Sequence, residues 1–460
     1  MPIFNYSTMS AAQALAFSAA DTLLVDQGSA NTTTIQFGAT TIVMTVAGTS
    51  VVFGAGLGNA TATFADGSRL FIGTTGNDAP SAFGAEDNGL YGGAGADTLD
   101  AGDGANQLQG NQGEDKLIGG RGRDVIYGGQ DNDTIIVGES SGGGTNFAQG
   151  NRGDDTISGS RVDSDTLLGG QGNDVLGASD AGPGRRSGLF TLYENPVGVS
   201  GGGNDVINGN LGDDVIFGGT GDDTLIGEDG RDHIVDSGGR NFIDAGADKD
   251  FIDVAGEATV YAGSGGDVID LRDGTFWVDM GDGDDACIGL FEGGVGQATI
   301  VGGSGRDLIR GTNGADSISG GSENDVLAGW GGQDTLSGGD GADEFDFYGG
   351  QSFTELSDLD VILDWTSADY LYFQDLKTGD AVGPGVGFNY FEGFASTYEA
   401  ALAMANAQIA AGEINYVAIQ VGSDVFVFAD SLTNNGVADT AVRLANCTLD
   451  AMGFANFLTG

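Results

Sequence analysis

The chain has few basic residues, prolines, cysteines and histidines. Of its 460 residues, 16 are lysine or arginine, 5 are proline, 2 are cysteine and 1 is histidine. With so few bases and no basic cluster, the chain would repel phosphate groups, which excludes nucleic acid as a partner. No run of apolar residues is long enough to cross a bilayer, so we expect no membrane insertion.

The sequence predicts no chemical role for the two cysteines or the histidine. Cys287 and Cys447 lie far apart, each among apolar neighbours, which predicts two buried thiols rather than a disulfide. The place of His233 favours an exposed position on a strand over a metal-binding or general-base role. No HExxH, GxSxG or P-loop sequence occurs, so we expect no catalytic residues and no enzymatic activity.

Glycine and acidic residues are abundant instead. The 87 glycines far exceed ordinary globular usage and predict many tight turns. The 67 acidic residues leave a formal net charge of -51, and most of them lie between residues 73 and 346. Charge of this density would push a compact chain apart without counterions, so we expect the protein to bind cations.

The acids recur at a fixed phase. Residues 119 to 136 read GGRGRDVIYGGQDNDTII, which is two nine-residue units, each with glycines first, aspartate sixth and an apolar residue eighth. The frame holds through five units from Gly92 to Ile136, six from Ser200 to Asp253 and five from Gly302 to Asp346. We expect the array to span residues 73–346, with a looped-out insertion near residues 178–198. Such repetition predicts a solenoid.

Each unit consists of a turn and a short strand. Its glycines permit positive φ angles, and its sixth to eighth residues, such as DVI, form a strand with one apolar side chain. One such strand cannot bury its apolar residue alone, so units must stack, two per coil, as two parallel sheets. Turns then stack 18 residues apart and offer carboxylate and carbonyl oxygens to a cation. This donor set suits Ca²⁺ better than a soft metal, and better than Mg²⁺ with its stricter octahedral geometry.

The pattern resembles the RTX family, whose nonapeptide G-G-x-G-x-D-x-U-x forms a calcium-binding parallel β-roll. The resemblance implies several bound Ca²⁺ ions, held by side chains of sixth-position aspartates and by carbonyls of second- and fourth-position glycines. In some units the frame departs: Asn106 and Asn241 replace the acid, and Phe276 stands where one would fall. The implied ligands are Asp97, Asp115, Asp124, Asp133, Asp155, Asp174, Asp205, Asp214, Asp223, Asp232, Asp250, Asp267, Asp285, Asp307, Asp316, Asp325, Asp334 and Asp343, with Gly93, Gly95, Gly120, Gly122, Gly219, Gly221, Gly303 and Gly305.

Two segments flank the array. Residues 1–72 predict a small β-rich N-terminal module, with a first helix near residues 10–19 followed by short Thr/Val/Ile strands. Residues 347–460 predict a C-terminal cap, in which residues 358–376 resemble the segment that follows the repeats of serralysin-type RTX proteins. The cap contains an amphipathic helix over residues 396–412, with Ser396 and Glu399 as a capping box, and two strands that turn at Gly422 to Asp424. The expected fold class is therefore all-β, a parallel β-roll with β-rich flanking modules and one helix near the C-terminus.

The flanks also bear on function. The N-terminus lacks the basic segment of a secretory signal, and the apolar tail resembles the C-terminal signal read by type I secretion machinery. We therefore expect a secreted protein, extracellular or at the cell surface, that folds on Ca²⁺ and self-assembles into an oligomer or lattice. Surface layer, matrix protein and adhesin remain open, with cell-surface polysaccharide as a further partner. The alternative is an exported effector or hydrolase that uses the β-roll as a folding module.

Overall fold

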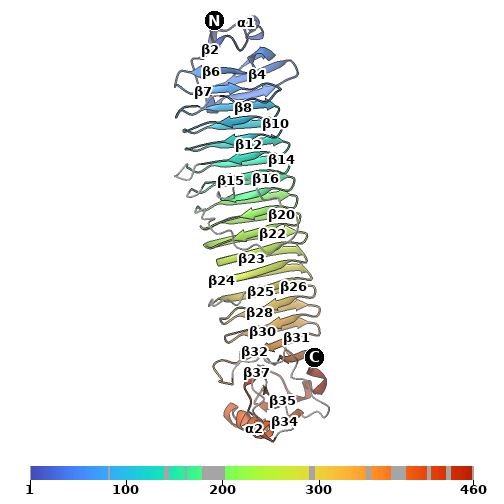
Figure 1. The fold of residues 1–460 in the computed structure, drawn as a ribbon. Helices are drawn as coiled ribbons and strands as arrows, with labels where there is room; N and C mark the ends of the chain where they lie inside the picture. The colour runs from blue at the N-terminus through green and yellow to red at the C-terminus, as the bar shows by residue number, and fades with distance from the viewer. Residues whose placement is uncertain are drawn as a thin grey trace. The chain divides into compact units, whose positions relative to one another are not determined.

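The computed structural model describes residues 2–80, 83–138, 144–160, 163–178, 203–289, 296–348, 354–374, 390–411, 416–430 and 437–457. The chain divides into two compact units, Met1–Phe242 and Ile243–Gly460. In each, stacked parallel strands form a β-solenoid (Figure 1). The predicted all-β parallel roll is therefore confirmed, and the predicted insertion at 178–198 lies almost wholly outside the described residues. The division at residues 72 and 346 remains a prediction.

In the repeats of the first unit, two kinds of strand alternate along the chain and build two parallel sheets. Each strand pairs with the next but one, so that Leu90 aligns with Leu108 and Leu108 with Ile126. This register confirms the predicted coil of two repeat units. The strands are β8 (Gly89–Ala94), β9 (Thr98–Asp100), β10 (Gln107–Gln112), β11 (Lys116–Ile118), β12 (Val125–Gln130), β13 (Thr134–Ile136), β14 (Phe147–Arg152), β15 (Thr156–Gly159), β16 (Thr166–Gln171), β17 (Val175–Ala178), β18 (Val206–Leu211), β19 (Val215–Phe217), β20 (Thr224–Asp229) and β21 (His233–Asp236).

The eighth-position apolar residues form the core between the two sheets. Leu108 and Ile126 from one sheet and Leu117 and Ile135 from the other are completely buried. A strand with only one inward side chain depends on its neighbours above and below for burial. The repeat therefore folds as a stack and has no stable single coil.

The second unit continues the same frame, except at two long strands. The turn aspartate of the frame is replaced by Ala258 in β23 and by Phe276 in β24, and both strands continue through that position, with a register irregularity between Val254 and Gly256. Both residues are buried, so an apolar side chain stands in the interior in place of a turn carboxylate. The strands are β22 (Arg240–Ala247), which includes residues of both units, β23 (Phe251–Gly265), β24 (Val268–Gly283), β25 (Ala286–Gly289), β26 (Gln297–Ser304), β27 (Leu308–Arg310), β28 (Ser317–Ser322), β29 (Val326–Ala328), β30 (Thr335–Asp340) and β31 (Glu344–Tyr348).

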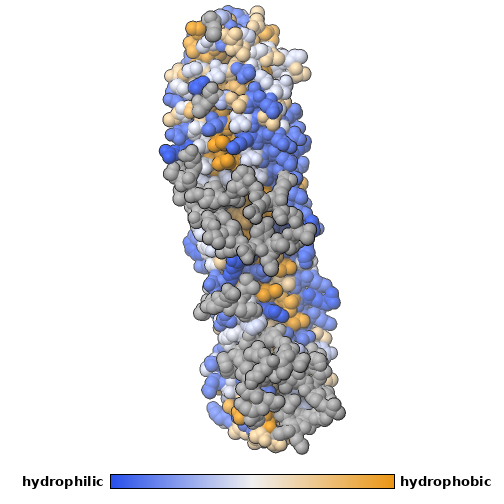
Figure 2. Space-filling view, in the orientation of Figure 1, coloured by the Kyte–Doolittle hydropathy of each residue, from blue (hydrophilic) through white to orange (hydrophobic). Residues whose placement is uncertain are grey.

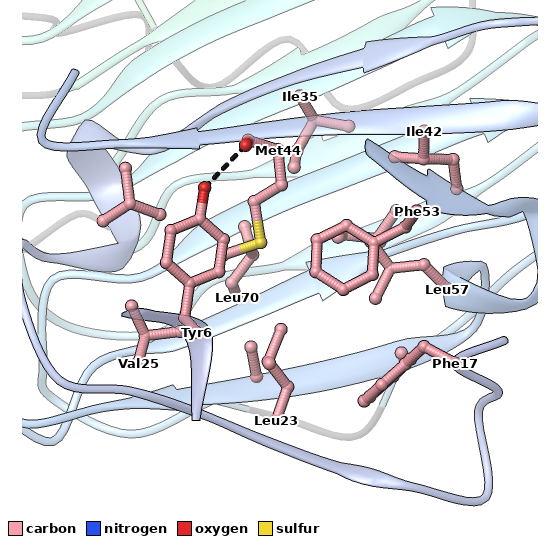
Figure 3. Packing of buried hydrophobic residues seen from close by; sticks show 14 of the residues in the cluster. Tyr6, Phe17, Leu23, Val25, Ile35, Ile42, Met44, Phe53, Leu57 and Leu70 are labelled. Atoms are coloured by element: carbon pink, nitrogen blue, oxygen red, sulfur yellow. Dashed lines mark hydrogen bonds between the residues drawn. The ribbon is translucent and has the colours of Figure 1, made fainter. Parts of the chain in front are cut away.

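The N-terminal module adds parallel strands before β8 and a separate antiparallel sheet of three strands. Its core gathers around Tyr6, whose hydroxyl donates to the Met44 carbonyl oxygen at 2.7 Å (Figure 3). The predicted first helix is shorter than expected, because Phe17 enters this core and Asp21 closes a turn by accepting the Ser18 N–H at 2.9 Å. The elements are β1 (Ile3–Asn5), η1 (Tyr6–Thr8), α1 (Ala11–Leu15), β2 (Thr22–Val25), η2 (Ala30–Thr32), β3 (Thr34–Phe37), β4 (Thr41–Val46), β5 (Thr49–Gly54), η3 (Ala55–Leu57), β6 (Ala60–Phe64) and β7 (Arg69–Ile72).

The C-terminal segment ends the second unit's solenoid. β32 pairs with β30 on one side and with β37 on the other, and β33 pairs with β31. The elements are β32 (Asp360–Ile362), β33 (Tyr370–Gln374), β34 (Tyr390–Ala395), α2 (Tyr398–Ala410), β35 (Tyr416–Val421), β36 (Asp424–Ala429), β37 (Thr440–Leu444), η4 (Leu449–Ala451) and η5 (Phe454–Asn456). The predicted hairpin turn is present, because β35 and β36 pair antiparallel through Val421 and Asp424.

The C-terminal helix corrects one detail of the prediction. Thr397, not Ser396, caps α2, since its hydroxyl accepts the Ala400 N–H at 3.3 Å. The buried face of α2 consists of Tyr398, Ala401, Ala405 and Ile409, while Leu402 is only half-buried. Neither helix of the described residues is long and apolar enough to cross a membrane. Cys287 and Cys447 are buried free thiols, as predicted, and His233 is half-buried on β21.

Two glycines test how closely the turns stack. Gly221 and Gly238 have nearly equal φ angles of +149° and +148°, but a methyl group on Gly221 would lie 1.6 Å from the Gly203 carbonyl oxygen, whereas one on Gly238 meets nothing within 4 Å. We expect Gly238→Ala to lower the free energy of unfolding by about 1–2 kcal/mol, the cost of a left-handed alanine. Gly221→Ala should cost a further ~1–3 kcal/mol because its coil must shift.

Chemical denaturation of the calcium-saturated protein measures both losses. Equal losses for the two variants would show that backbone strain alone, and not turn stacking, requires these glycines.

Candidate metal sites

The sixth-position side chains form ladders along the stack. In each step the backbone N–H of one aspartate donates to Oδ1 of the next one in the ladder, as from Asp97 to Asp115 at 2.7 Å and from Asp115 to Asp133 at 2.9 Å. The first unit holds two ladders, Asp78–Asp97–Asp115–Asp133–Asp155–Asp174–Asp214–Asp232 and Asn88–Asn106–Asp124–Asn146–Asp165–Asp205–Asp223–Asn241. The second unit holds Asp250–Asp267–Asp285–Asp307–Asp325–Asp343–Asp369 and Ala298–Asp316–Asp334–Asp360.

The other carboxylate oxygen, Oδ2, is the unusual feature of these ladders. It is buried and has no hydrogen-bond partner among the described residues in fourteen of the predicted ligands. A buried anionic oxygen without a donor or a cation is strongly destabilising. These oxygens belong to Asp97, Asp115, Asp124, Asp133, Asp155, Asp174, Asp214, Asp223, Asp267, Asp285, Asp307, Asp325, Asp334 and Asp343.

Twelve of these Oδ2 atoms lie beside the first-position glycine of their turn, whereas Ala262 and Met280 stand at that position in the turns of Asp267 and Asp285. A methyl group on Gly110 would lie 2.2 Å from Asp115 Oδ2 and 2.7 Å from the Gly128 carbonyl oxygen. Gly320 shows the same arrangement, at 2.3 Å from Asp325 Oδ2 and 2.7 Å from the carbonyl oxygen of Gly338. Carboxylate and carbonyl oxygens from successive coils therefore converge where a side chain would otherwise stand.

The second- and fourth-position glycines let the turns lie directly on one another. All eight that the sequence singled out have positive φ angles: Gly93, Gly95, Gly120, Gly122, Gly219, Gly221, Gly303 and Gly305. Among the described residues, no cluster of three or more histidine, cysteine or acidic side chains could hold a metal ion. The oxygens that converge in these turns are aspartate carboxylates and backbone carbonyls, as at Asp115 and Gly128. Such a set of hard oxygen donors fits Ca²⁺.

Burial and mutual repulsion disturb the titration of these carboxyl groups. Burial raises the pKa of Asp97 to about 6, of Asp115 to about 7 and of Asp133 to about 8. The neighbouring Asp155 carboxylate raises the pKa of Asp133 further. In the second unit burial raises the pKa of Asp325 to about 7. Without a cation, the folded repeats therefore hold protons near neutral pH that isolated aspartates would release.

All eighteen predicted aspartates are buried in the turns, with exposed fractions of 3% or less. Asp316 differs from the others, because its Oδ2 accepts the Thr312 N–H at 2.6 Å and lies 3.1 Å from the Thr312 hydroxyl. Asn241 keeps the ladder hydrogen bond, since its Oδ1 accepts the Asp223 N–H at 2.9 Å, but it brings no charge. Asn106, Asn241 and Phe276, where the frame departs, bring no carboxylate to that position.

The sequence interpretation missed five buried carboxyl groups. Asp78, Asp165, Asp360 and Asp369 occupy ladder positions although their units depart from the nine-residue frame. For the last three, an apolar residue two places after the aspartate was the available signal. Asp236 occupies the first position of its unit, where the frame has glycine, and its Oδ1 accepts a side-chain hydrogen bond from Asn241 at 2.5 Å. It restores an acid to a turn whose own sixth position is neutral.

The raised pKa values predict how calcium-free protein responds to pH. Folding raises these pKa values from 3.8 to about 6–8, so the folded chain without calcium favours the protonated carboxyl groups. Their contribution to stability is therefore present at acidic pH and is lost as the pH rises through that range. We expect metal-free protein to show more β-structure and a higher Tm at pH 5 than at pH 8, as followed by circular dichroism. With Ca²⁺ the order should reverse, because the ion competes with protons. A calcium-free Tm that rises toward pH 8 would contradict the assigned burial.

The comparison with protein-family sequences agrees with this geometry. The sequence model of the RTX calcium-binding nonapeptide repeat (4 copies) matches residues 84–108, 109–139, 140–176, 199–234, 226–258, 292–327 and 310–345. No curated protein matches the chain. One similar solved structure is the X-ray crystal structure of a hyperactive, Ca²⁺-dependent, β-helical antifreeze protein from an Antarctic bacterium, with 20% identity, 60% of this chain and 84% of that chain covered, and a TM-score of 0.25. The family match to turns of this kind confirms the resemblance: the chain belongs to the RTX family of calcium-binding nonapeptide-repeat proteins.

Proposed function

We propose that this protein folds on binding several Ca²⁺ ions outside the cell and acts there as a structural, self-assembling surface component without catalytic activity. The observation that carries the proposal is the series of buried Asp Oδ2 oxygens that have no donor among the described residues. Extracellular modules bind Ca²⁺ with dissociation constants of about 10⁻⁴–10⁻³ M. Sites of that affinity stay empty at low intracellular calcium, so folding is coupled to export.

Self-assembly is supported by the surface of the N-terminal module. Ile3, Leu15 and Val52 are 67%, 53% and 46% exposed, and Figure 2 shows apolar residues at this end of the first unit. Strand β1, which pairs with β2, has no second strand partner among the described residues. The module's sequence contains few charges that would keep molecules apart. An open strand edge with so few charged neighbours favours pairing between molecules.

The proposal includes partners and a route. The partners are further copies of the chain, in an oligomer or lattice that forms a surface layer, matrix or adhesin, and cell-surface polysaccharide. Type I secretion machinery is the proposed exporter, on the basis of the resemblance of the C-terminal tail. Calcium acts twice in this scheme, first ordering the repeats and then screening their acidic surfaces so that copies can approach.

An isosteric substitution separates the role of the aspartate charge in metal binding from the role of the side chain as a hydrogen-bond acceptor in the ladder. Asp115→Asn keeps an acceptor for the Asp97 N–H, as Asn106, Asn146 and Asn241 do at their positions, but removes the charge. We expect the calcium midpoint of folding to rise about two- to tenfold, while metal-free protein at pH 8 becomes more stable because one buried charge is gone. Calcium titrations followed by circular dichroism measure both effects.

The adjacent Glu114→Gln is the matched control, since it removes one exposed charge from the same turn. It should move neither quantity appreciably. If Asp115→Asn and Glu114→Gln behaved alike, charge density and not a defined site would govern the response to calcium.

Self-association is tested by charging the exposed apolar residues of the N-terminal module. The double variant Ile3→Lys/Val52→Lys should weaken calcium-dependent association at least about tenfold, because two apolar contacts are replaced by repelling charges. Sedimentation velocity at several millimolar Ca²⁺ measures it, with Leu211→Lys, which is 45% exposed on the repeats, as the matched control. If the full-length protein stays monomeric at high concentration, self-assembly is contradicted and the alternative, an exported effector or hydrolase, is favoured.

A further inference from the structure

A groove lies beside the first coils of the repeats, within the first unit. Its volume is about 1000 Å³. One wall is the hairpin of β3 and β4, with Ile35, Gln36 and Phe37, and the facing wall comes from strands β8, β10, β12 and β14. The hairpin and these strands belong to the blue and cyan part of the chain in Figure 1. The stacked aspartates are not among its lining residues, although Gly93 and Gly128 of their turns are.

Hydrogen bonds hold the two walls in place. The hydroxyl of the fully buried Tyr91, on β8, donates to the Thr33 carbonyl oxygen just before β3. Asn31 reaches across in the other direction, with its Nδ2 donating to the Ala105 carbonyl oxygen at 2.8 Å. The hairpin also buries Ile42 and Met44 in the N-terminal core. The groove is therefore formed before any ligand arrives, which lowers the entropy cost of binding.

The lining differs sharply from the rest of this acidic protein. It contains no acidic residue and a single base, Arg152, although the chain as a whole carries 67 acids. Two aromatic side chains contribute, Tyr127 and the 37% exposed Phe37. Six of the lining side chains are amides: Gln36, Gln109, Asn111, Gln112, Gln130 and Asn151. The groove thus offers neutral donors and acceptors beside aromatic rings.

The coil register arranges these side chains in rows. Gln112 aligns with Gln130, and Gln130 with Arg152, at the spacing of neighbouring strands, which is ~4.8 Å. In a second row Gln109 aligns with Tyr127. Within the described residues, the side chains of Gln109, Gln112 and Gln130 make no hydrogen bond. The groove therefore presents unused amide groups at regular steps to whatever lies along it.

We propose that this groove binds a glycan chain. Hydroxyl groups of sugars both donate and accept, which matches amides, and the C–H faces of sugar rings pack against aromatic rings such as Tyr127. An apolar ligand would leave the amides without partners at a cost for each. A cation would find no carboxylate in the lining, and a phosphate backbone would find only Arg152. Arg152 suits a carboxylate on an acidic sugar.

This inference goes beyond the proposed assembly, because it names the ligand by which the N-terminal end would attach to polysaccharide. It can fail while calcium-driven folding holds, provided that binding is measured on protein already shown to be folded. The experiment therefore uses the full chain at several millimolar Ca²⁺, with circular dichroism of every variant. The probes are cellohexaose, chitohexaose and a mannuronate hexasaccharide, titrated by calorimetry.

We expect at least one hexasaccharide to bind, and Gln112→Ala/Gln130→Ala and Tyr127→Ala each to weaken binding about tenfold. Gln171→Ala is the matched control, since it occupies the same row beside Arg152 but is not part of the lining. It should leave binding unchanged. Arg152→Ala should weaken only the mannuronate probe, which separates an acidic from a neutral glycan.

Three results would overturn the proposal. The first is that none of the three sugars binds at millimolar concentration to folded protein. The second is that Gln171→Ala weakens binding as much as the groove variants. The third is that no sugar binds while Gln112→Ala/Gln130→Ala abolishes self-association, because the occupant of the groove would then be a strand of a second copy paired with β3.

Discussion

A buried carboxylate oxygen that lacks a hydrogen-bond donor is the constraint on which the repeats depend. Oδ1 of each such ladder aspartate takes a backbone N–H, which fixes the side chain, and in turns such as those of Asp115 and Asp325 Oδ2 then points into a space with a carbonyl oxygen nearby. Stacking identical turns repeats this arrangement at every coil and places like charges near each other. Burial then raises the pKa of Asp115 to about 7, so the calcium-free stack is penalised at neutral pH.

The glycines and apolar residues are consequences of the same stacking. A methyl group on Gly120 would lie 1.9 Å from the Gly102 carbonyl oxygen, so the turns approach as closely as the backbone permits. The eighth-position residues, such as Leu117, fill the interior that the paired sheets enclose. Where the turn aspartate is replaced, as at Phe276, the strand is continuous through that position and an apolar side chain is buried in place of the carboxylate. Turn chemistry therefore decides where a cation can bind.

The repeats could be predicted from the sequence because their local and long-range requirements share one period. The aspartate, the glycines and the apolar residue each have a fixed place, so one unit describes the coil. Irregular units were harder: Asp165 and Asp369 lie outside the frame, and an apolar residue two places later was their signal in the sequence. Asp316 could not be distinguished from the other aspartates, because its partner Thr312 replaces a glycine without changing the phase. The groove depends on how β3 and β4 lie beside the coils, and no periodicity encodes that placement.

The central claim is that calcium ions complete the turns that the aspartates build. The most direct test is a crystal structure of the full chain grown at millimolar Ca²⁺, with anomalous scattering used to locate the ions. The account predicts ions at ~2.3–2.6 Å from Asp115 Oδ2, Asp325 Oδ2 and nearby carbonyl oxygens, in turns of both units. It also predicts no ion bound by Asp316 Oδ2, because Thr312 already satisfies that oxygen. Ladder carboxylates that bond only to water or protein donors, with no ion beside them, would contradict the account.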